Sequence, residues 1–284
     1  MISEFIASWA LFKFTYLSGW AVGLVLSLLG VVVVARDQIF IGAAISQAST
    51  LGIAIGLVFG SYLDEKTHSW AHSELFVSAL AVAFSIAAAI ITAHKSRQGG
   101  ESQEAVTGWI FLLSSSLSIL IVSKSPHGLE QINGLLSSSI IGATAFDASA
   151  FALFFLATAI AFHKYNKEII LLSVDREMAS AVGLETGILD AAISVWLGLI
   201  IGLAIHIAGT LFTFGCLVLP ALVAKNLCRE VRWMFLFAPL VALAVNVAGF
   251  VAANYYDFPP AQMVVTAMAA LVPAAWMVKY ARKG

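Results

Sequence analysis

Charged residues are scarce in this chain of 284 residues, where Asp, Glu, Lys and Arg together make up 11% of the sequence. A soluble domain usually carries about 25% charged residues, so a soluble globular protein is not expected. The net charge of −1 carries no information about a nucleic-acid partner, and no basic patch suggests one. Hydrophobic residues take the remaining space, at 61% of the chain and a mean hydropathy of +0.95.

Motifs for several kinds of chemistry are also missing. Only two cysteines occur, Cys216 and Cys228, without the spacing of a zinc or redox site, so they are interpreted as packing residues. The zinc-protease motif H-E-x-x-H and the phosphate loop G-x-x-x-x-G-K-[ST] are absent. No elbow motif frames the serines at 114–116 for a serine protease with His206. The first residues lack the features of a cleavable signal.

Long apolar runs dominate the sequence, and about 20 such residues are needed to cross a bilayer as a helix. The runs predict an all-α, polytopic membrane protein of eight or nine transmembrane helices, forming one permease-like domain over residues 1–284. The predicted spans are 15–35, 39–61, 74–93, 105–123, 146–162, 188–206, 209–225, 233–253 and 261–279. Residues 127–145 are half-polar and rich in Gly and Ser, which favours a short helix or a re-entrant segment.

Basic residues orient the chain, because loops on the inner side of a membrane are enriched in Lys and Arg. With the C-terminus inside, nine spans place the N-terminus outside and put 61–74 and 254–260 in outer loops. Lys13, Lys66 and Lys124 then lie outside. The other 12 of the 15 basic residues lie inside: Arg36, Lys95, Arg97, Lys164, Lys167, Arg176, Lys225, Arg229, Arg232, Lys279, Arg282 and Lys283.

The largest inner loop, 163–187, contains the segment SVDREMASAVG, which reads as a short amphipathic helix. Asp175 is a plausible N-cap, Met178 an early apolar contact, and Gly183 a stop. Such a helix at the cytoplasmic surface can dock a soluble partner. The alternative is a solvated connector between two spans.

Two apolar segments carry features that suggest a pathway. Segment 39–56 holds Ser46, Gln47, Ser49 and Thr50 among glycines. Segment 208–224 contains Pro220, which kinks a membrane helix, and Gly209 and Gly215, which let neighbouring helices approach closely. A packing kink is the plain alternative. Ionisable residues deep in the spans are few, with His206 the main candidate, which argues against a proton-driven carrier.

Five segments in order resemble motifs of the permease family of metal-type (zinc, manganese and iron) ABC transporters. RDQIFIGAAISQASTLGIA (36–54) resembles R-R-M-x-x-x-G-D-A-L-S-H-A-x-x-P-G-I-A, and SVDREMASAVGLETGILD (173–190) resembles F-D-P-E-x-A-x-x-x-G. The others are EAVTGWIF (104–111), GTLFTFGCLVLPALVA (209–224) and YYDFPPAQ (255–262), similar to D-x-x-I-G-x-x-F, G-x-L-L-V-x-A-L-L-I-x-P-A-x-x-A and D-L-P-S-G-A. The resemblance covers about residues 15–280.

The resemblance implies a multi-pass permease in the cell (inner or plasma) membrane that imports divalent metal ions by alternating access. It pairs with a second permease protomer, as a homo- or heterodimer, and receives its cargo from an extracytoplasmic metal-binding protein. Carried over, Asp175, Glu177, Ala179 and Gly183 would form the coupling helix for a cytoplasmic ABC ATPase. The chain itself would be no enzyme and bind no cofactor, because the partner uses the ATP.

The sequence departs from the family where the family's second span carries Asp and His four residues apart, the spacing of a metal-binding helix face. Here Ala43 and Gln47 stand there, beside Gly42, Ser46 and Thr50 on the expected translocation path. Three interpretations follow. Weak ligands suffice for a passing metal ion, or a heterodimer partner keeps the Asp/His pair, or the substrate is a metal chelate or another small solute.

Three histidines are further candidates: His206 for replacing a lost ligand, and His68 and His72 for a mouth that collects ions or a docking contact for the binding protein. His206 could supply one within the pathway, or could be an ordinary hydrogen-bonded interior histidine. In the outer loop, His68 and His72 lie four residues apart, so one helical turn would align them as metal ligands. A solvated polar loop is the competing interpretation. A secondary carrier without an ATPase remains the rival class of transporter.

Overall fold

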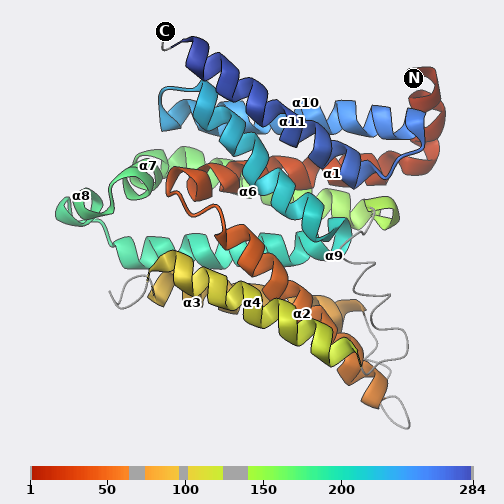
Figure 1. Ribbon diagram of the computed structural model, residues 1–284, viewed down its shortest axis with the longest axis horizontal. Helices are drawn as coiled ribbons and strands as arrows, with labels where there is room; N and C mark the ends of the chain where they lie inside the picture. The colour runs from red at the N-terminus through yellow and green to blue at the C-terminus, as the bar shows by residue number, and fades with distance from the viewer. Residues whose placement is uncertain (1, 64–73, 96–101, 124–139, 283–284) are drawn as a thin grey trace. The chain divides into compact units, whose positions relative to one another are not determined.

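The computed structural model describes residues 2–63, 74–95, 102–123 and 140–282, and no strand occurs among them. Eight described helices are long and apolar enough to cross a bilayer, which confirms the predicted all-helical membrane fold. Helices are required because lipid offers the backbone no hydrogen-bond partners. The elements (Figure 1) are α1 (Ile2–Ala35), α2 (Ile41–Leu63), α3 (Glu74–Lys95), α4 (Gln103–Val122), η1 (Ile140–Gly142), α6 (Ala145–Lys164), α7 (Asn166–Val174), α8 (Arg176–Ala181), α9 (Thr186–Leu227), α10 (Val231–Tyr256) and α11 (Pro260–Ala281).

Helix α9 accounts for the uncertainty between eight and nine spans. Its 42 residues would extend about 60 Å, roughly twice the hydrocarbon thickness of a bilayer. The helix is broken at Gly209, where φ is 78° and ψ is 168°. The two spans predicted at 188–206 and 209–225 are therefore the two helical stretches of one continuous element. Of segment 127–145, residues 127–139 lie outside the described residues.

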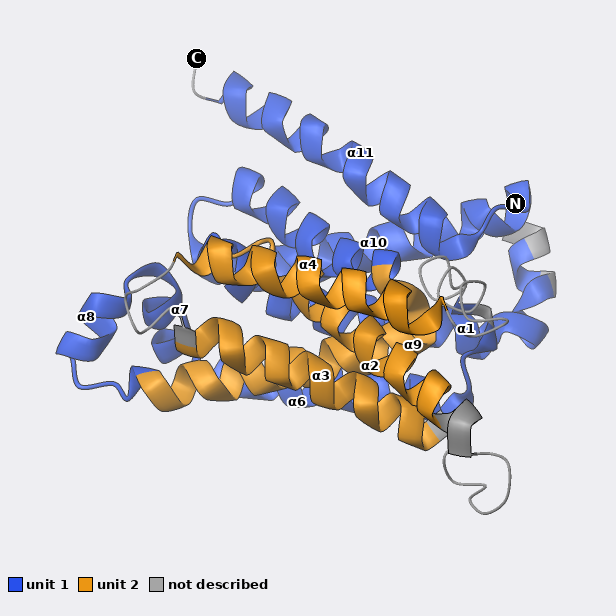
Figure 2. Ribbon diagram, turned by 60° about the horizontal axis from the view of Figure 1, so that its bottom comes forward, with its two compact units in different colours: residues 1–37, 139–186, 211–284 blue, residues 38–138, 187–210 orange. Residues whose placement is uncertain are grey.

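The chain divides into two compact units (Figure 2), each drawn from separate segments of sequence. Unit 1 comprises residues 1–37, 139–186 and 211–284, and unit 2 comprises 38–138 and 187–210. The chain passes from unit 2 to unit 1 immediately after the break at Gly209. Because both units are interleaved along the sequence, the single permease domain over 1–284 stays a prediction.

Unit 2 is built around α3, which contacts both α2 and the first stretch of α9. A Cβ added at Gly52 of α2 would lie 2.5 Å from the Leu80 carbonyl oxygen, and one at Gly198 would lie 2.7 Å from Ile86 Cα. Ser85 Oγ also donates a hydrogen bond of 2.6 Å to the Gly198 carbonyl. Glycines thus let both neighbours approach the α3 backbone closely, as is usual between membrane helices.

Unit 1 packs α1 against α10 and α6, and α10 against α11. Its basic residues bind the carbonyl ends of helices. Lys225 Nζ donates to the Val34 carbonyl at 3.2 Å and also pairs with Asp37, while Arg282 Nη1 donates to the Leu227 carbonyl at 3.2 Å. Cations are favoured at these ends because the unpaired carbonyls of a helix C-terminus carry partial negative charge.

Candidate functional site

The polar face of α2 is largely buried. Ser46, Ser49 and Thr50 are 2%, 0% and 1% exposed, and Thr50 Oγ1 donates to the Ser46 carbonyl at 3.1 Å. The hydroxyls of Ser46 and Ser49 have no hydrogen-bond partner in the described part of the chain. A buried polar group without a partner costs about 1–3 kcal/mol, so these two hydroxyls are the groups on this face that would gain most from a bound water or solute.

The glycines of α2 serve a different purpose from its polar residues. At about 100° per residue, Gly42, Ser46 and Thr50 fall along one side of the helix, with Ala43 and Gln47 beside them. Gly52 and Gly56 pack on α3. Gly52 lies about 120° around the helix from Ser46, whereas Gly56 lies only about 40° from Gly42, so the α3-packing side of α2 adjoins the side that carries the hydroxyl and amide groups.

Ligands for a metal ion are sparse around this face. Among the described residues, no three His, Cys, Asp or Glu side chains gather where they could hold a metal ion. Ala43 and Gln47 are both half-buried, one turn apart on α2. His206 belongs to the same unit, three residues before the break in α9, and its buried Nδ1 has no partner in the described part of the chain. His68 and His72 lie outside the described residues.

Two buried polar residues were not predicted as site residues. Ser49 belongs to the polar segment 39–56 but not to the residues that the sequence assigns to the path, and the structure buries it completely. Asn246 lies in the middle of α10, is fully buried, and donates to the Ala242 carbonyl at 2.8 Å. A lone asparagine inside an apolar run was the available signal, since intramembrane polar residues are seldom incidental.

Helix α8 forms where the sequence predicts it. Asp175 is the N-cap, with Oδ1 accepting the Met178 N–H at 2.9 Å. Gly183 ends the turn at a φ of +87°, with its N–H on the Ser180 carbonyl, and the Leu184 N–H returns to the Ala179 carbonyl at 3.1 Å. This pair of bonds is a Schellman motif, in which glycine takes the left-handed position at least cost. Both ends of this one-and-a-half-turn helix are therefore fixed by their own residues.

Around α8, apolar side chains face outward. Val174, Met178 and Val182 are 64%, 56% and 65% exposed, whereas Ala179 is fully buried. Met178 therefore does not make the early apolar contact within the chain that the sequence suggested. Within unit 1, α8 lies at the same end as the C-terminal ends of α1 and α11, on the left of Figure 1. That end carries Lys225, Lys279 and Arg282.

Comparison with known proteins places these features in a family. The profile of the ABC 3 transport family matches residues 9–279. The chain is 22% identical to a probable metal transport system membrane protein of Thermotoga maritima, over 92% of this chain and 87% of the relative. It is 25% identical to the high-affinity zinc uptake system membrane protein ZnuB of Buchnera aphidicola, over 87% and 91% of the two chains.

A solved structure has the same fold. PsaBC from Streptococcus pneumoniae in complex with Fab matches with a TM-score of 0.78 and 20% identity, covering 97% of this chain and 95% of that one. The family match extends over nearly the entire sequence, and the five motifs that suggested it lie within the matched residues. The protein is thus a multi-pass membrane permease that belongs to the ABC 3 transport family.

Proposed function

We propose that this chain is the membrane-spanning subunit of an ATP-binding cassette importer for divalent metal ions such as zinc, manganese or iron. A separate cytoplasmic ATPase hydrolyses ATP and drives alternating access, and this chain performs no chemical step. The observation that carries the proposal is α8, a capped helix with exposed apolar side chains at the basic end of its unit. The names of the relatives support the choice of cargo.

The ATPase contact is proposed to centre on Val174, Met178 and Val182. Apolar side chains more than half exposed to water are unusual outside the bilayer and favour a protein interface. Asp175 and Gly183 fix the shape of the turn that presents them, Ala179 anchors it in the chain, and Glu177 is exposed on its surface. A movement of the ATPase would therefore be transmitted to α7 and to the spans that follow and precede it.

Copurification tests this contact. Replacing Met178→Asp puts a charge in the centre of the proposed interface, and loss of an interface anchor typically weakens binding tenfold or more. The recovered ATPase should therefore fall by about that factor, with the permease still present in the membrane. Tyr280→Ser is the matched control, because Tyr280 is 75% exposed at the same end of the unit but lies on α11. Equal recovery from Met178→Asp and wild type would overturn the contact.

The translocation path is proposed to run along the polar face of α2. Gly42, Ala43, Ser46, Gln47 and Thr50 would line it, with His206 contributing from α9. A second permease protomer would complete the path about a two-fold axis. If metal ions pass here, Ala43→Asp together with Gln47→His should change the relative uptake of zinc, manganese and iron by the whole complex. Unchanged rates and selectivity would show that ions are not selected on α2.

A second candidate cargo is a metal chelate or another small neutral solute. The unpartnered hydroxyls of Ser46 and Ser49 favour it, together with the lack of a three-ligand group in the described residues. A substrate that brings its own ligands needs only hydrogen bonds from the path. Uptake of the free ion and of the same ion bound to an excess of chelator, compared in one complex, separates the two cargoes. A heterodimer partner that supplies Asp and His would instead favour the free ion.

Two remaining parts of the assembly are also proposals. An extracytoplasmic metal-binding protein would deliver cargo to the outer loops at 61–74 and 254–260, and His68 and His72 stay a prediction there. The rival class is a secondary carrier that needs no ATPase. Transport by the purified chain alone in proteoliposomes, without ATP or a partner, would establish that rival and exclude the ABC mechanism.

A further inference from the structure

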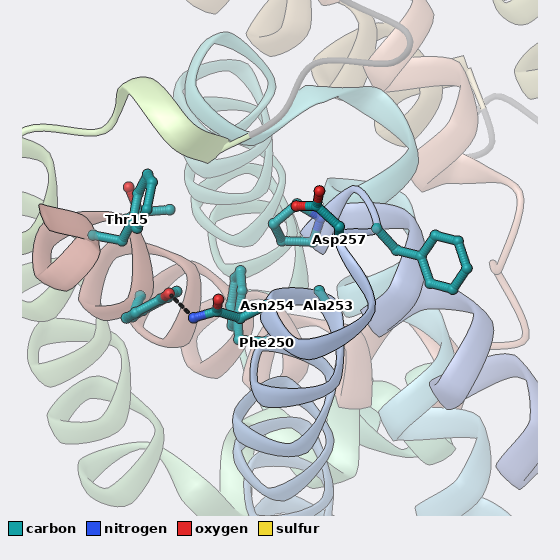
Figure 3. Close-up of a pocket in the computed structure, with 9 residues that line it drawn as sticks. Thr15, Phe250, Ala253, Asn254 and Asp257 are labelled. Atoms are coloured by element: carbon teal, nitrogen blue, oxygen red, sulfur yellow. Dashed lines mark hydrogen bonds between the residues drawn. The ribbon is translucent and has the colours of Figure 1, made fainter. Parts of the chain in front are cut away.

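A pocket of about 130 Å³ lies in unit 1 between the first helix and the loop that joins α10 to α11. Figure 3 shows Thr15 of α1 across the pocket from Asn254 and Asp257. The pocket is several times the roughly 30 Å³ that one water occupies. It is lined by Phe12, Thr15, Tyr16, Phe250, Ala253, Asn254, Asp257, Phe258 and Pro260.

Aromatic rings form the wall of this pocket. The ring centroids of Phe12 and Tyr16 are 6.3 Å apart, and those of Tyr16 and Phe250 are 5.6 Å apart. Tyr16 is held by a hydrogen bond of 3.1 Å from Asn254 Nδ2, which also donates to Ser8 Oγ. Because the amide nitrogen supplies both bonds, the amide oxygen of Asn254 remains an acceptor. Tyr16 and Phe250 are almost fully buried, whereas Phe12 and Phe258 are 36% and 57% exposed. The wall thus combines accessible aromatic rings, which can attract cations, with a neutral oxygen.

The only carboxylate among the lining residues is that of Asp257. This residue caps α10 in the left-handed conformation, with φ of 60° and ψ of 35°. Glycine would take that conformation at the lowest cost, and asparagine and aspartate tolerate it, so the backbone geometry alone does not require a carboxylate here. No described residue forms an ion pair with Asp257. Lys13, next to Phe12 in sequence, has its Nζ 4.9 Å from the ring centroid of Phe14.

The combination selects one ligand chemistry. An anion is disfavoured by Asp257, and a bare divalent ion needs more oxygen or nitrogen ligands than one carboxylate and one amide provide. An acyl chain would leave the carboxylate and the amide oxygen without partners. An organic ammonium group fits the whole lining. It forms an ion pair with a carboxylate, is attracted to aromatic rings and donates a hydrogen bond to an amide oxygen.

We infer that this pocket binds the ammonium group of a zwitterionic lipid headgroup, such as phosphatidylethanolamine, at the membrane surface. The pocket lies at the ends of the spanning helices, where Tyr255 and Tyr256 are 46% and 56% exposed. Aromatic residues in such positions mark the level of the lipid headgroups. The inference does not depend on the proposed transport function, since it concerns lipid retention by this chain.

Lipid retention by the purified full-length chain tests the inference. The delipidated protein is offered equal amounts of phosphatidylethanolamine and phosphatidylglycerol with matched acyl chains, and bound lipid is counted by native mass spectrometry. Wild type should retain the ethanolamine lipid over the glycerol lipid by several-fold, the scale of a solvent-exposed cation–π contact together with an exposed charge pair. Asp257→Asn keeps the shape and the tolerance for the left-handed conformation, and should reduce the preference to within about twofold.

Phe12→Leu removes one ring from the wall without touching Asp257 and should give an intermediate preference. Leu11→Ala is the control, because Leu11 neighbours Phe12 in sequence and is 82% exposed but does not line the pocket. If free ethanolamine displaces the bound lipid, the site belongs to small soluble amines. If the preference for the ethanolamine lipid persists in the presence of free ethanolamine, the site belongs to lipid. An unchanged preference in Asp257→Asn, or an equal loss in Leu11→Ala, would overturn the inference. So would crosslinks that place a second copy of the chain over a lipid-free pocket.

Discussion

Gly209 has a backbone conformation that other residues rarely adopt. Its φ of 78° and ψ of 168° belong to a region that is essentially restricted to glycine, and strain there costs about 1–3 kcal/mol for a residue with a Cβ. We therefore expect Gly209→Ala to lower the free energy of unfolding by about that amount and to reduce transport. Thermal unfolding in detergent and uptake by the whole complex measure the two effects.

Gly142→Ala is the control for this substitution, because a Cβ there meets nothing within 4 Å and its φ is not positive. It should leave both measurements near wild type. If Gly209→Ala were as stable as Gly142→Ala, the break in α9 would be a consequence of its surroundings and would not require glycine at that position.

Buried serines of unit 2 differ in whether their hydroxyls are satisfied. Ser49 Oγ has no partner in the described residues, whereas Ser85 Oγ donates to the Val82 and Gly198 carbonyls at 2.8 and 2.6 Å. Ser49→Ala should therefore leave stability unchanged or raise it by up to about 1 kcal/mol, while transport falls several-fold if the hydroxyl serves a solute. Ser85→Ala should instead destabilise by about 1 kcal/mol. Parallel unfolding and uptake measurements compare the two, and destabilisation by Ser49→Ala would contradict the assignment.

At the scale of elements, α1 is held by a contact that tolerates no side chain. A Cβ added at Gly30 would lie 1.7 Å from the Leu217 carbonyl oxygen in the second stretch of α9. The backbone of one helix would have to move, so Gly30→Ala should destabilise the protein by several kcal/mol or prevent its accumulation in the membrane. Expression and thermal unfolding measure this effect.

Gly108→Ala is the matched control, since Gly108 also lies in a spanning helix but a Cβ there meets no atom within 4 Å. Alanine is the better helix former, so this variant should be as stable as wild type or more stable. If Gly30→Ala accumulated in the membrane and unfolded at the same temperature as wild type, α1 and α9 would be less closely packed than in the structure.

The helices and their ends could largely be predicted from the sequence, because they depend on local patterns. Apolar runs gave the spans, and Asp175 and Gly183 gave both ends of α8. The functions of individual polar and small residues could not be predicted in the same way. Gly52 and Ser46 are neighbours in sequence but face different sides of α2, and only the position of α3 assigns the first to packing. Asn246 is buried through tertiary contacts, which no single-helix pattern contains.

At the scale of the whole molecule, orientation follows from charge and is linked to the proposed ATPase contact. Within unit 1, the carbonyl ends of α1 and α9 bind Lys225 and Arg282, and α8 lies at the same end. Loops on the inner side of a membrane are enriched in basic residues, so this end of unit 1 is expected to face the cytoplasm. A measurement of which side of the membrane this end faces therefore also gives the side on which α8 lies. Cys228, the residue that ends α9, is half-buried there and provides a chemical probe.

Cys228 should react with a membrane-permeant maleimide in intact cells but not with an impermeant one, and inverted vesicles should reverse the second result. Burial raises the pKa of the Cys228 thiol above its ordinary value of 9.0, although Arg282 opposes this. Less thiolate is therefore present at pH 7, so labelling should be slow there and accelerate as pH rises. Cys228→Ser should abolish labelling, because Cys216 is fully buried. Labelling of intact cells by the impermeant reagent would place this end outside, and α8 could then contact no cytoplasmic ATPase.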